Sequence, residues 1–140
     1  MRDDISVIIG TIGSDCHIVG STIIARTLDM SGIKVVQLGA CVAQEEFIDA
    51  AIETKADVIM VSSMYGMGFF DCDGLRDKCV ESGLDDILLY VGGYLSVDNE
   101  DDAVITEKFE GIGFDRVYLP GTNPKSVVVD LISDLRQGEA

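Results

Sequence analysis

The sequence is short of basic residues, of histidine and of proline, and it contains no tryptophan. Ten Lys and Arg stand against 25 Asp and Glu, which gives a formal net charge of −15. A surface with this excess of negative charge repels the phosphates of nucleic acids and of anionic lipids. Binding to nucleic acid or to a membrane surface is therefore disfavoured. The acidic residues are spread along the chain. A solvated acidic surface explains most of them, and adaptation to high salt is the alternative.

Long apolar runs are also absent. No run reaches the length of a membrane span, and the N-terminal residues MRDDISV lack the pattern of a signal peptide. Apolar residues nevertheless make up 47% of the 140 residues, enough for one hydrophobic core. We therefore expect a soluble, cytoplasmic protein with a single domain over residues 1–140.

The four cysteines form no C-x-x-C pair and no zinc-binding spacing. In a cytoplasmic chain they are most simply free thiols. Cys72 and Cys79 are seven residues apart, a spacing that places them on one face of a helix and favours a packing role.

Five short apolar runs rich in β-branched residues alternate with helical patterns. The runs are 5–12, 34–39, 57–63, 87–93 and 116–120. They are nearly continuous rather than alternating, which is typical of strands buried on both faces of a parallel sheet. The helical patterns span 19–32, 43–56, 71–83, 101–113 and 123–137, and the last carries Pro124 in its first turn.

Five strand–helix repeats with right-handed crossovers predict a doubly wound α/β sheet of the flavodoxin-like, or Rossmann-like, type with strand order 2-1-3-4-5. In such sheets ligands bind at the carboxyl ends of the strands. The segments expected there, GSDCHIVG, SSMYGMG, GGYLSVD and PGTNP, are rich in glycine and hydroxyl residues. They suit the close approach of a large ligand.

The usual occupants of this fold fit poorly. Gly10, Gly13 and Gly20 do not have the G-x-G-x-x-G spacing, and GMGFFD (66–71) follows the third strand, where its glycines suit a turn. No lysine precedes Ser21 as a P-loop requires. A receiver domain would need an aspartate where the third strand ends in serines. Flavin binding stays open, because a few hydroxyl side chains follow the first strand.

His17 is the only histidine, and it lies two residues after Asp15. In an extended segment the two side chains point the same way, so Asp15 can orient the imidazole while its other nitrogen binds a metal. The alternative to a metal site is a purely structural one, in which Asp15 caps a helix and His17 is an ordinary surface residue. One imidazole is too few for an all-protein metal site, but it is enough for a metal that brings its own equatorial ligands.

Asp15-x-His17-x-x-Gly20 resembles the D-x-H-x-x-G signature of cobalamin-binding domains, in which the histidine replaces the cofactor's benzimidazole as lower axial ligand. The S-x-L marker of that family is matched by Ser62-Ser63-Met64, with Met in place of Leu, and its G-G marker by Gly92-Gly93. Beyond these motifs, most of the chain is similar to the family of glutamate mutase small subunits. A swap of Leu for Met keeps the volume and the apolar character.

The resemblance implies roles for particular residues. Asp15 and His17 are the catalytic pair, and His17 is the cobalt ligand. Tyr118 either adjoins the cofactor tail or belongs to the core. The residues expected to bind the cofactor are Ser14, Asp15, Cys16, His17, Ile18, Gly20, Ser62, Ser63, Met64, Gly92, Gly93, Tyr94, Leu95, Ser96, Val97, Asp98, Gly121 and Thr122. By alternation only one of Ser62 and Ser63 faces the ligand, and the family match selects Ser62.

The resemblance also implies a function. We expect the cobalamin-binding subunit of an adenosylcobalamin-dependent radical mutase that interconverts L-glutamate and threo-3-methyl-L-aspartate. The implied partner is a large barrel-shaped subunit that holds the substrate, in a heterotetramer of two small and two large subunits, and this chain alone should be inactive. The alternatives are a corrinoid-binding subunit of another mutase or a methyltransferase, and a non-catalytic flavin or small-ligand module.

Overall fold

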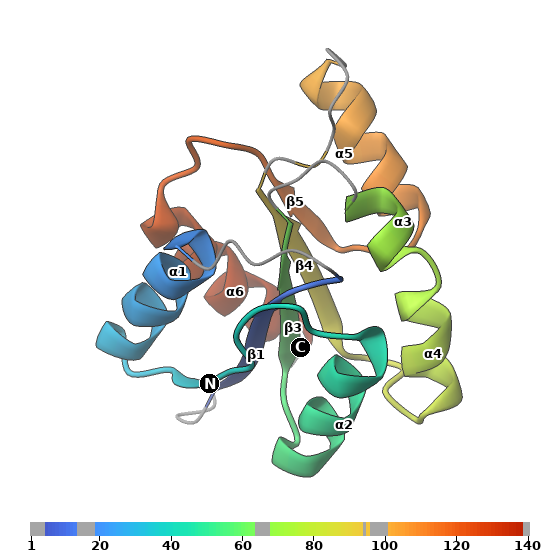
Figure 1. Cartoon of the computed structure of the whole chain (residues 1–140). Coiled ribbons are helices and arrows are strands. Elements are labelled where there is room, and N and C mark those ends of the chain that lie inside the picture. Colours follow the sequence, from blue (N-terminus) through green and yellow to red (C-terminus); the bar gives the residue numbers. More distant parts are fainter. Residues whose placement is uncertain (1–4, 14–18, 64–67, 94, 96–100, 139–140) are drawn as a thin grey trace.

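The computed structural model describes residues 5–13, 19–63, 68–93, 95 and 101–138 (Figure 1). In these residues five parallel strands form one sheet, in the order β2-β1-β3-β4-β5. The predicted flavodoxin-like fold and its strand order are confirmed. The strands are β1 (Ser6–Thr11), β2 (Lys34–Gln37), β3 (Val58–Ser62), β4 (Leu88–Gly92) and β5 (Arg116–Tyr118).

Helices cover both faces of the sheet, as its buried strands require. The helices are α1 (Val19–Met30), α2 (Gln44–Thr54), α3 (Gly68–Cys72), α4 (Leu75–Glu81), α5 (Asp102–Gly111) and α6 (Pro124–Gly138). Helices α1 and α6 lie side by side on one face, and α2 to α5 lie on the other (Figure 1). None of the helices in the described ranges is both long enough and apolar enough to cross a bilayer.

The alternation of side chains along each strand divides the core into two clusters. Val7 and Ile9 of β1 pack with Met60 and Tyr90 toward α1 and α6. Ile8 of β1 packs instead in the cluster that faces α2 to α5. Every residue of β1 and β3 is buried, which explains why these two runs read as continuously apolar.

Three features differ from the sequence prediction. The pattern at 71–83 is not one helix but two, α3 and α4, because Gly74 adopts a left-handed conformation with φ +90° between them. Of the two glycines at 66–71 that were expected to suit a turn, Gly68 instead begins α3, and Gly66 lies outside the described residues. The fifth strand also ends earlier than predicted, at Tyr118. Pro120 lies just beyond it and has no N–H for the sheet.

The predicted start of α6 at Pro124 is confirmed. The side chain of Asn123 accepts a hydrogen bond from the backbone N–H of Lys125 (3.0 Å) and so satisfies one donor at the helix start. This start fixes the position of α6 relative to the end of β5.

Candidate functional site

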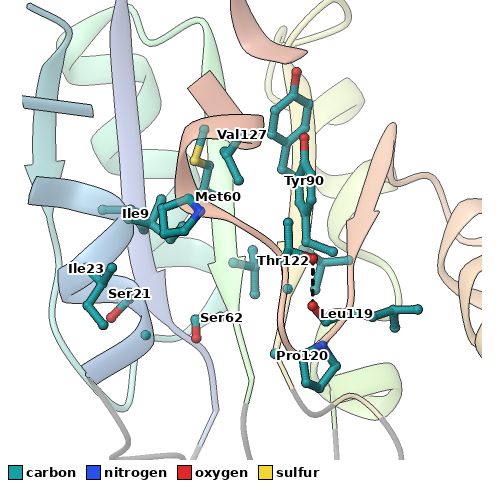
Figure 2. A pocket seen from close by; sticks show the side chains of 18 of the residues that line it. Ile9, Ser21, Ile23, Met60, Ser62, Tyr90, Leu119, Pro120, Thr122 and Val127 are labelled. Carbon is teal, nitrogen blue, oxygen red and sulfur yellow. Dashed lines mark hydrogen bonds between the residues drawn. The ribbon is translucent and has the colours of Figure 1, made fainter. Parts of the chain in front are cut away.

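A cavity of ≈ 300 Å³ lies between the sheet and the helices α1 and α6, toward the carboxyl ends of the strands. Figure 2 shows Ser21 and Ser62 nearer the strand ends, and Met60, Tyr90 and Val127 farther back. The lining residues are Ile9, Gly20, Ser21, Ile23, Ile24, Met60, Val61, Ser62, Tyr90, Val91, Gly92, Gly93, Tyr118, Leu119, Pro120, Gly121, Thr122, Pro124 and Val127. No described residue of this lining is charged, so the cavity suits an uncharged, largely apolar group.

The back of the cavity is fixed by two tyrosines. The rings of Tyr90 and Tyr118 meet edge to face at 5.8 Å between centroids. The Tyr90 hydroxyl donates a hydrogen bond to Asp134, and the Tyr118 hydroxyl donates one to Asp130 (2.7 Å). Both acceptors are on α6, so these bonds hold the helix against β4 and β5 and commit both hydroxyls to α6.

Arg116 completes this network from β5. Its guanidinium donates to both carboxylate oxygens of Asp134, each at 2.8 Å, and lies 3.6 Å from the carboxylate of Asp130. The hydrogen bonds from Arg116 lower the pKa of Asp134, against the opposing effect of burial. Burial, and then the bonds to these carboxylates, raise the pKa values of Tyr90 and Tyr118, so both tyrosines stay protonated donors.

Hydroxyl groups gather toward the opening of the cavity. Ser21 in the first turns of α1 is buried, and its oxygen lies 3.4 Å from that of Thr11. Ser62 ends β3 and lines the cavity. On the opposite side, the hydroxyl of Thr122 donates to the carbonyl of Leu119 (2.7 Å; Figure 2). These groups can offer hydrogen bonds to the polar end of a ligand whose flat part lies deeper.

Two glycines of the cavity lining, Gly92 and Gly20, have different surroundings. A Cβ on Gly92 would lie 3.3 Å from the Cβ and from the carbonyl oxygen of Tyr118, a tight contact that β5 could relieve only by shifting a few tenths of an ångström. A Cβ on Gly20 would meet no atom within 4 Å, which shows that the space beside the start of α1 is open. A ligand can therefore approach the backbone of Gly20 at the start of α1.

The structure brings several of the predicted site residues together and separates others from them. Those that line the cavity are Gly20, Ser62, Gly92, Gly93, Gly121 and Thr122, and Tyr118 joins them. Ser63 is fully buried outside this lining, and Leu95 packs in the core with Ile105 and Phe109 on the other face of the sheet. The remaining predicted residues lie outside the described ranges: Ser14, Asp15, Cys16, His17, Ile18, Met64, Tyr94, Ser96, Val97 and Asp98.

Sequence reasoning missed the deeper lining, namely Ile9, Met60, Tyr90 and Val127. A signal for part of it was present. Met60 precedes Ser62 by two residues on β3, so it shares the face of that predicted ligand-binding serine. Tyr90 is paired with Met60 in the sheet register and extends the same face onto β4.

The described residues hold no cluster of three or more His, Cys, Asp or Glu side chains that could bind a metal ion by themselves. Cys72 and Cys79 are free and fully buried in one core cluster, as the predicted packing role requires, but they belong to α3 and α4 and not to one helix. Burial raises the pKa of both thiols, so neither is a ready metal ligand.

Comparison with known families identifies the class of protein. Residues 5–129 match the family described as B12 binding domain. Because this match spans most of the sequence, the chain belongs to the B12 binding domain family. The monomethylamine corrinoid protein of Methanosarcina barkeri has the same fold, with a TM-score of 0.71, 22% identity and 90% of this chain covered. The chain spans 57% of that structure.

Curated relatives narrow the assignment. The chain is 50% identical over 130 residues to the glutamate mutase sigma subunit of Clostridium tetani, covering 93% of this chain and 95% of that protein. It is 48% identical over 132 residues to the glutamate mutase sigma subunit of Escherichia coli O157:H7, covering 94% and 89%. The chain is thus a member of the sigma subunit family, and the predicted resemblance is confirmed.

Proposed function

We propose that the chain binds adenosylcobalamin as the cobalamin-binding subunit of a glutamate mutase, the isomerase that interconverts L-glutamate and threo-3-methyl-L-aspartate. The observation that carries this proposal is the cavity at the carboxyl ends of the strands. Its lining contains Gly20 from the D-x-H-x-x-G motif, and Ser62 and the pair Gly92-Gly93 from the two later family motifs. Three separate motifs thus border one apolar space.

The described residues fit the flat, uncharged base of a cobalamin nucleotide. The cavity is lined by aliphatic and aromatic side chains at the back, by glycine backbone at the sides and by hydroxyls near the opening. Tyr90 and Tyr118 present their rings to this space because their hydroxyls are bound to α6. A base buried in this cavity would be held away from the cobalt, so it would not compete with a protein ligand for the metal.

In this proposal His17 would hold the cobalt through a nitrogen of its imidazole. Asp15 accepts the N–H of the other ring nitrogen and so fixes the tautomer and orientation of the imidazole. Ser62 offers its hydroxyl to the displaced nucleotide tail. When bound, adenosylcobalamin supplies the radical chemistry by homolysis of its cobalt–carbon bond, while the protein binds, orients and excludes water.

The substrate site belongs to a second, larger, barrel-shaped subunit, and the active assembly contains two small and two large subunits. The composition of the cavity supports this division, because no arginine or lysine is among its described lining residues. Such cations would be needed to hold the two carboxylates of glutamate. The chain alone is therefore expected to bind cofactor without turning over substrate.

The test combines binding and reconstitution. The purified chain is titrated with hydroxocobalamin by visible spectroscopy. A separate sample loaded with adenosylcobalamin is mixed with a glutamate mutase large subunit and assayed for methylaspartate. We expect binding, with activity only in the mixture. His17→Ala should abolish or severely weaken binding, and Asp15→Asn should weaken it less. Near-native affinity in His17→Ala would contradict the proposal.

A further inference from the structure

The end of β1 is covered by an acidic side chain from the opposite side of the sheet from the cavity. A Cβ on Gly13 would lie 2.4 Å from Oδ2 and 2.8 Å from Oδ1 of Asp71. Gly13 also has a φ of +74°, which L side chains rarely adopt. The carboxylate of Asp71 therefore rests directly on the backbone of Gly13, at a place where only glycine leaves room for it.

Asp71 is held in this position by the elements around it. Gln44 at the start of α2 donates its side-chain N–H groups to the carbonyls of Asp71 (2.7 Å) and Asp73 (2.9 Å). Phe69, two residues earlier on α3, packs edge to face on Phe109 of α5 at 5.9 Å between centroids. The short helix α3 is thus fixed to α2 and to α5, and Asp71 is presented to Gly13 by a fixed element.

Gly13 is fixed on its other sides as well. Its N–H donates to the carbonyl of Val42 (2.9 Å), and the N–H of Ile12 donates to the carbonyl of Ser62 at the end of β3 (3.1 Å). The backbone at position 13 is therefore bounded by the segment after β2, by β3 and by the carboxylate of Asp71. The next residues in the sequence are those that carry Asp15 and His17.

We propose that Asp71 is a positioning residue for the cobalt ligand: its carboxylate, seated on Gly13, fixes the direction in which the chain leaves β1 toward His17. This inference rests on the proposed function, because it needs His17 to bind cobalt. Asp71 lies on α3, 54 positions after His17 in the sequence, and is not among the residues expected to bind the cofactor. Its effect on cobalt is indirect, through the backbone it contacts.

The experiment measures the affinity of the full chain for hydroxocobalamin and the nitrogen splitting in the electron paramagnetic resonance spectrum of the Co(II) form. Asp71→Ala should lower the affinity about tenfold, the low end of the range for loss of a group that positions a metal ligand. It should also reduce the fraction of cobalt that carries a histidine nitrogen. The near-isosteric Asp71→Asn should retain part of the affinity. Asp73→Asn, an exposed neighbour, is the matched control and should change neither readout.

A double substitution tests the contact itself. Gly13→Ala alone should weaken binding, since its methyl group would overlap the carboxylate. In an Asp71→Ala background the overlap is gone, so the further loss caused by Gly13→Ala should be several-fold smaller, with only the strained φ remaining. Thermal unfolding of each variant shows whether it is folded, and Asp71→Asn decides the question if Asp71→Ala does not fold.

The outcomes separate this inference from the proposed function. If the unaltered chain binds cobalamin without a histidine nitrogen on cobalt, the proposed function fails and this inference fails with it. If the unaltered chain shows that nitrogen, and folded Asp71 variants show the same affinity and splitting, only the positioning role is overturned. Independent, multiplicative losses in the double variant would likewise overturn the contact between Asp71 and Gly13 as its basis.

Discussion

The Tyr90 hydroxyl tests how firmly α6 is held against the back of the cavity. Tyr90 is 1% exposed and donates to Asp134, a hydrogen bond to a charged group of the kind that contributes about 1.5–3 kcal/mol. In Tyr90→Phe the carboxylate keeps both bonds from Arg116, so it is not left unpaired. We therefore expect a loss of about 1.5 kcal/mol in the free energy of unfolding, at the lower end of that range.

Tyr118→Phe is the matched control. Its acceptor, the side chain of Asp130, is 30% exposed, so water can replace the lost donor. We expect a smaller loss, about 0.5 kcal/mol. The assay is urea unfolding of the cobalamin-free chain at neutral pH, followed by circular dichroism. A loss in Tyr118→Phe that equals or exceeds that in Tyr90→Phe would refute this account of the network.

The same network should respond to acid in a defined direction. The pKa of Asp134 is lowered in the folded chain, chiefly by the bonds from Arg116, whereas an unfolded Asp titrates at about 3.9. The stabilisation from the ionised carboxylate is therefore complete above about pH 4 and is lost as pH falls through the lower folded value. Asp134→Asn should be most destabilising at neutral pH and approach the unaltered chain in acid. A pH-independent difference would contradict the assignment.

Two further predictions concern the cavity. Gly20→Leu should fold normally, because a Cβ there meets no atom within 4 Å. Its side chain would occupy the space for the ligand and lower the affinity for cobalamin at least about tenfold. Gly111→Leu is the control: a Cβ there is equally unobstructed, but Gly111 is outside the cavity lining, so the affinity should stay unchanged. Spectroscopic titration of both variants decides this, and equal affinities would remove the cavity as the tail site. Ser62→Ala should weaken cobalamin binding, whereas Ser63→Ala should not, because only Ser62 lines the cavity. Ser63→Ala should instead raise the midpoint of urea unfolding, because it removes a buried hydroxyl that has no partner among the described residues. A lower midpoint in Ser63→Ala would show that its hydroxyl is paired.

The fold could be read from the sequence because its signals are local. Strand β3 is buried on both faces, and its run at 57–63 reads as nearly continuous apolar sequence. The last helix has a clear start signal in Pro124. The division of 71–83 into α3 and α4 could not be read in this way. It depends on the left-handed conformation of Gly74, which a glycine permits but does not require.

The candidate site could be predicted only where motifs mark it. Ser62 and Gly92 were expected from their motifs, and both line the cavity. The network of Tyr90, Arg116 and Asp134 joins residues far apart in the sequence, and local sequence patterns do not predict such hydrogen bonds. The contact between Asp71 and Gly13 is of the same kind, because it follows from the packing of α3 over the end of β1.

The central claim is that the chain's lone histidine coordinates cobalt in place of the cofactor's own base. Because His17 is the only histidine, growth with ¹⁵N-histidine labels one imidazole in the whole chain. The electron paramagnetic resonance spectrum of the bound Co(II) form then reports directly on the axial nitrogen. We predict that the nitrogen splitting changes its multiplicity with the label. A spectrum identical to that of unlabelled protein would show that His17 does not coordinate the cobalt, and it would contradict the proposed role of His17.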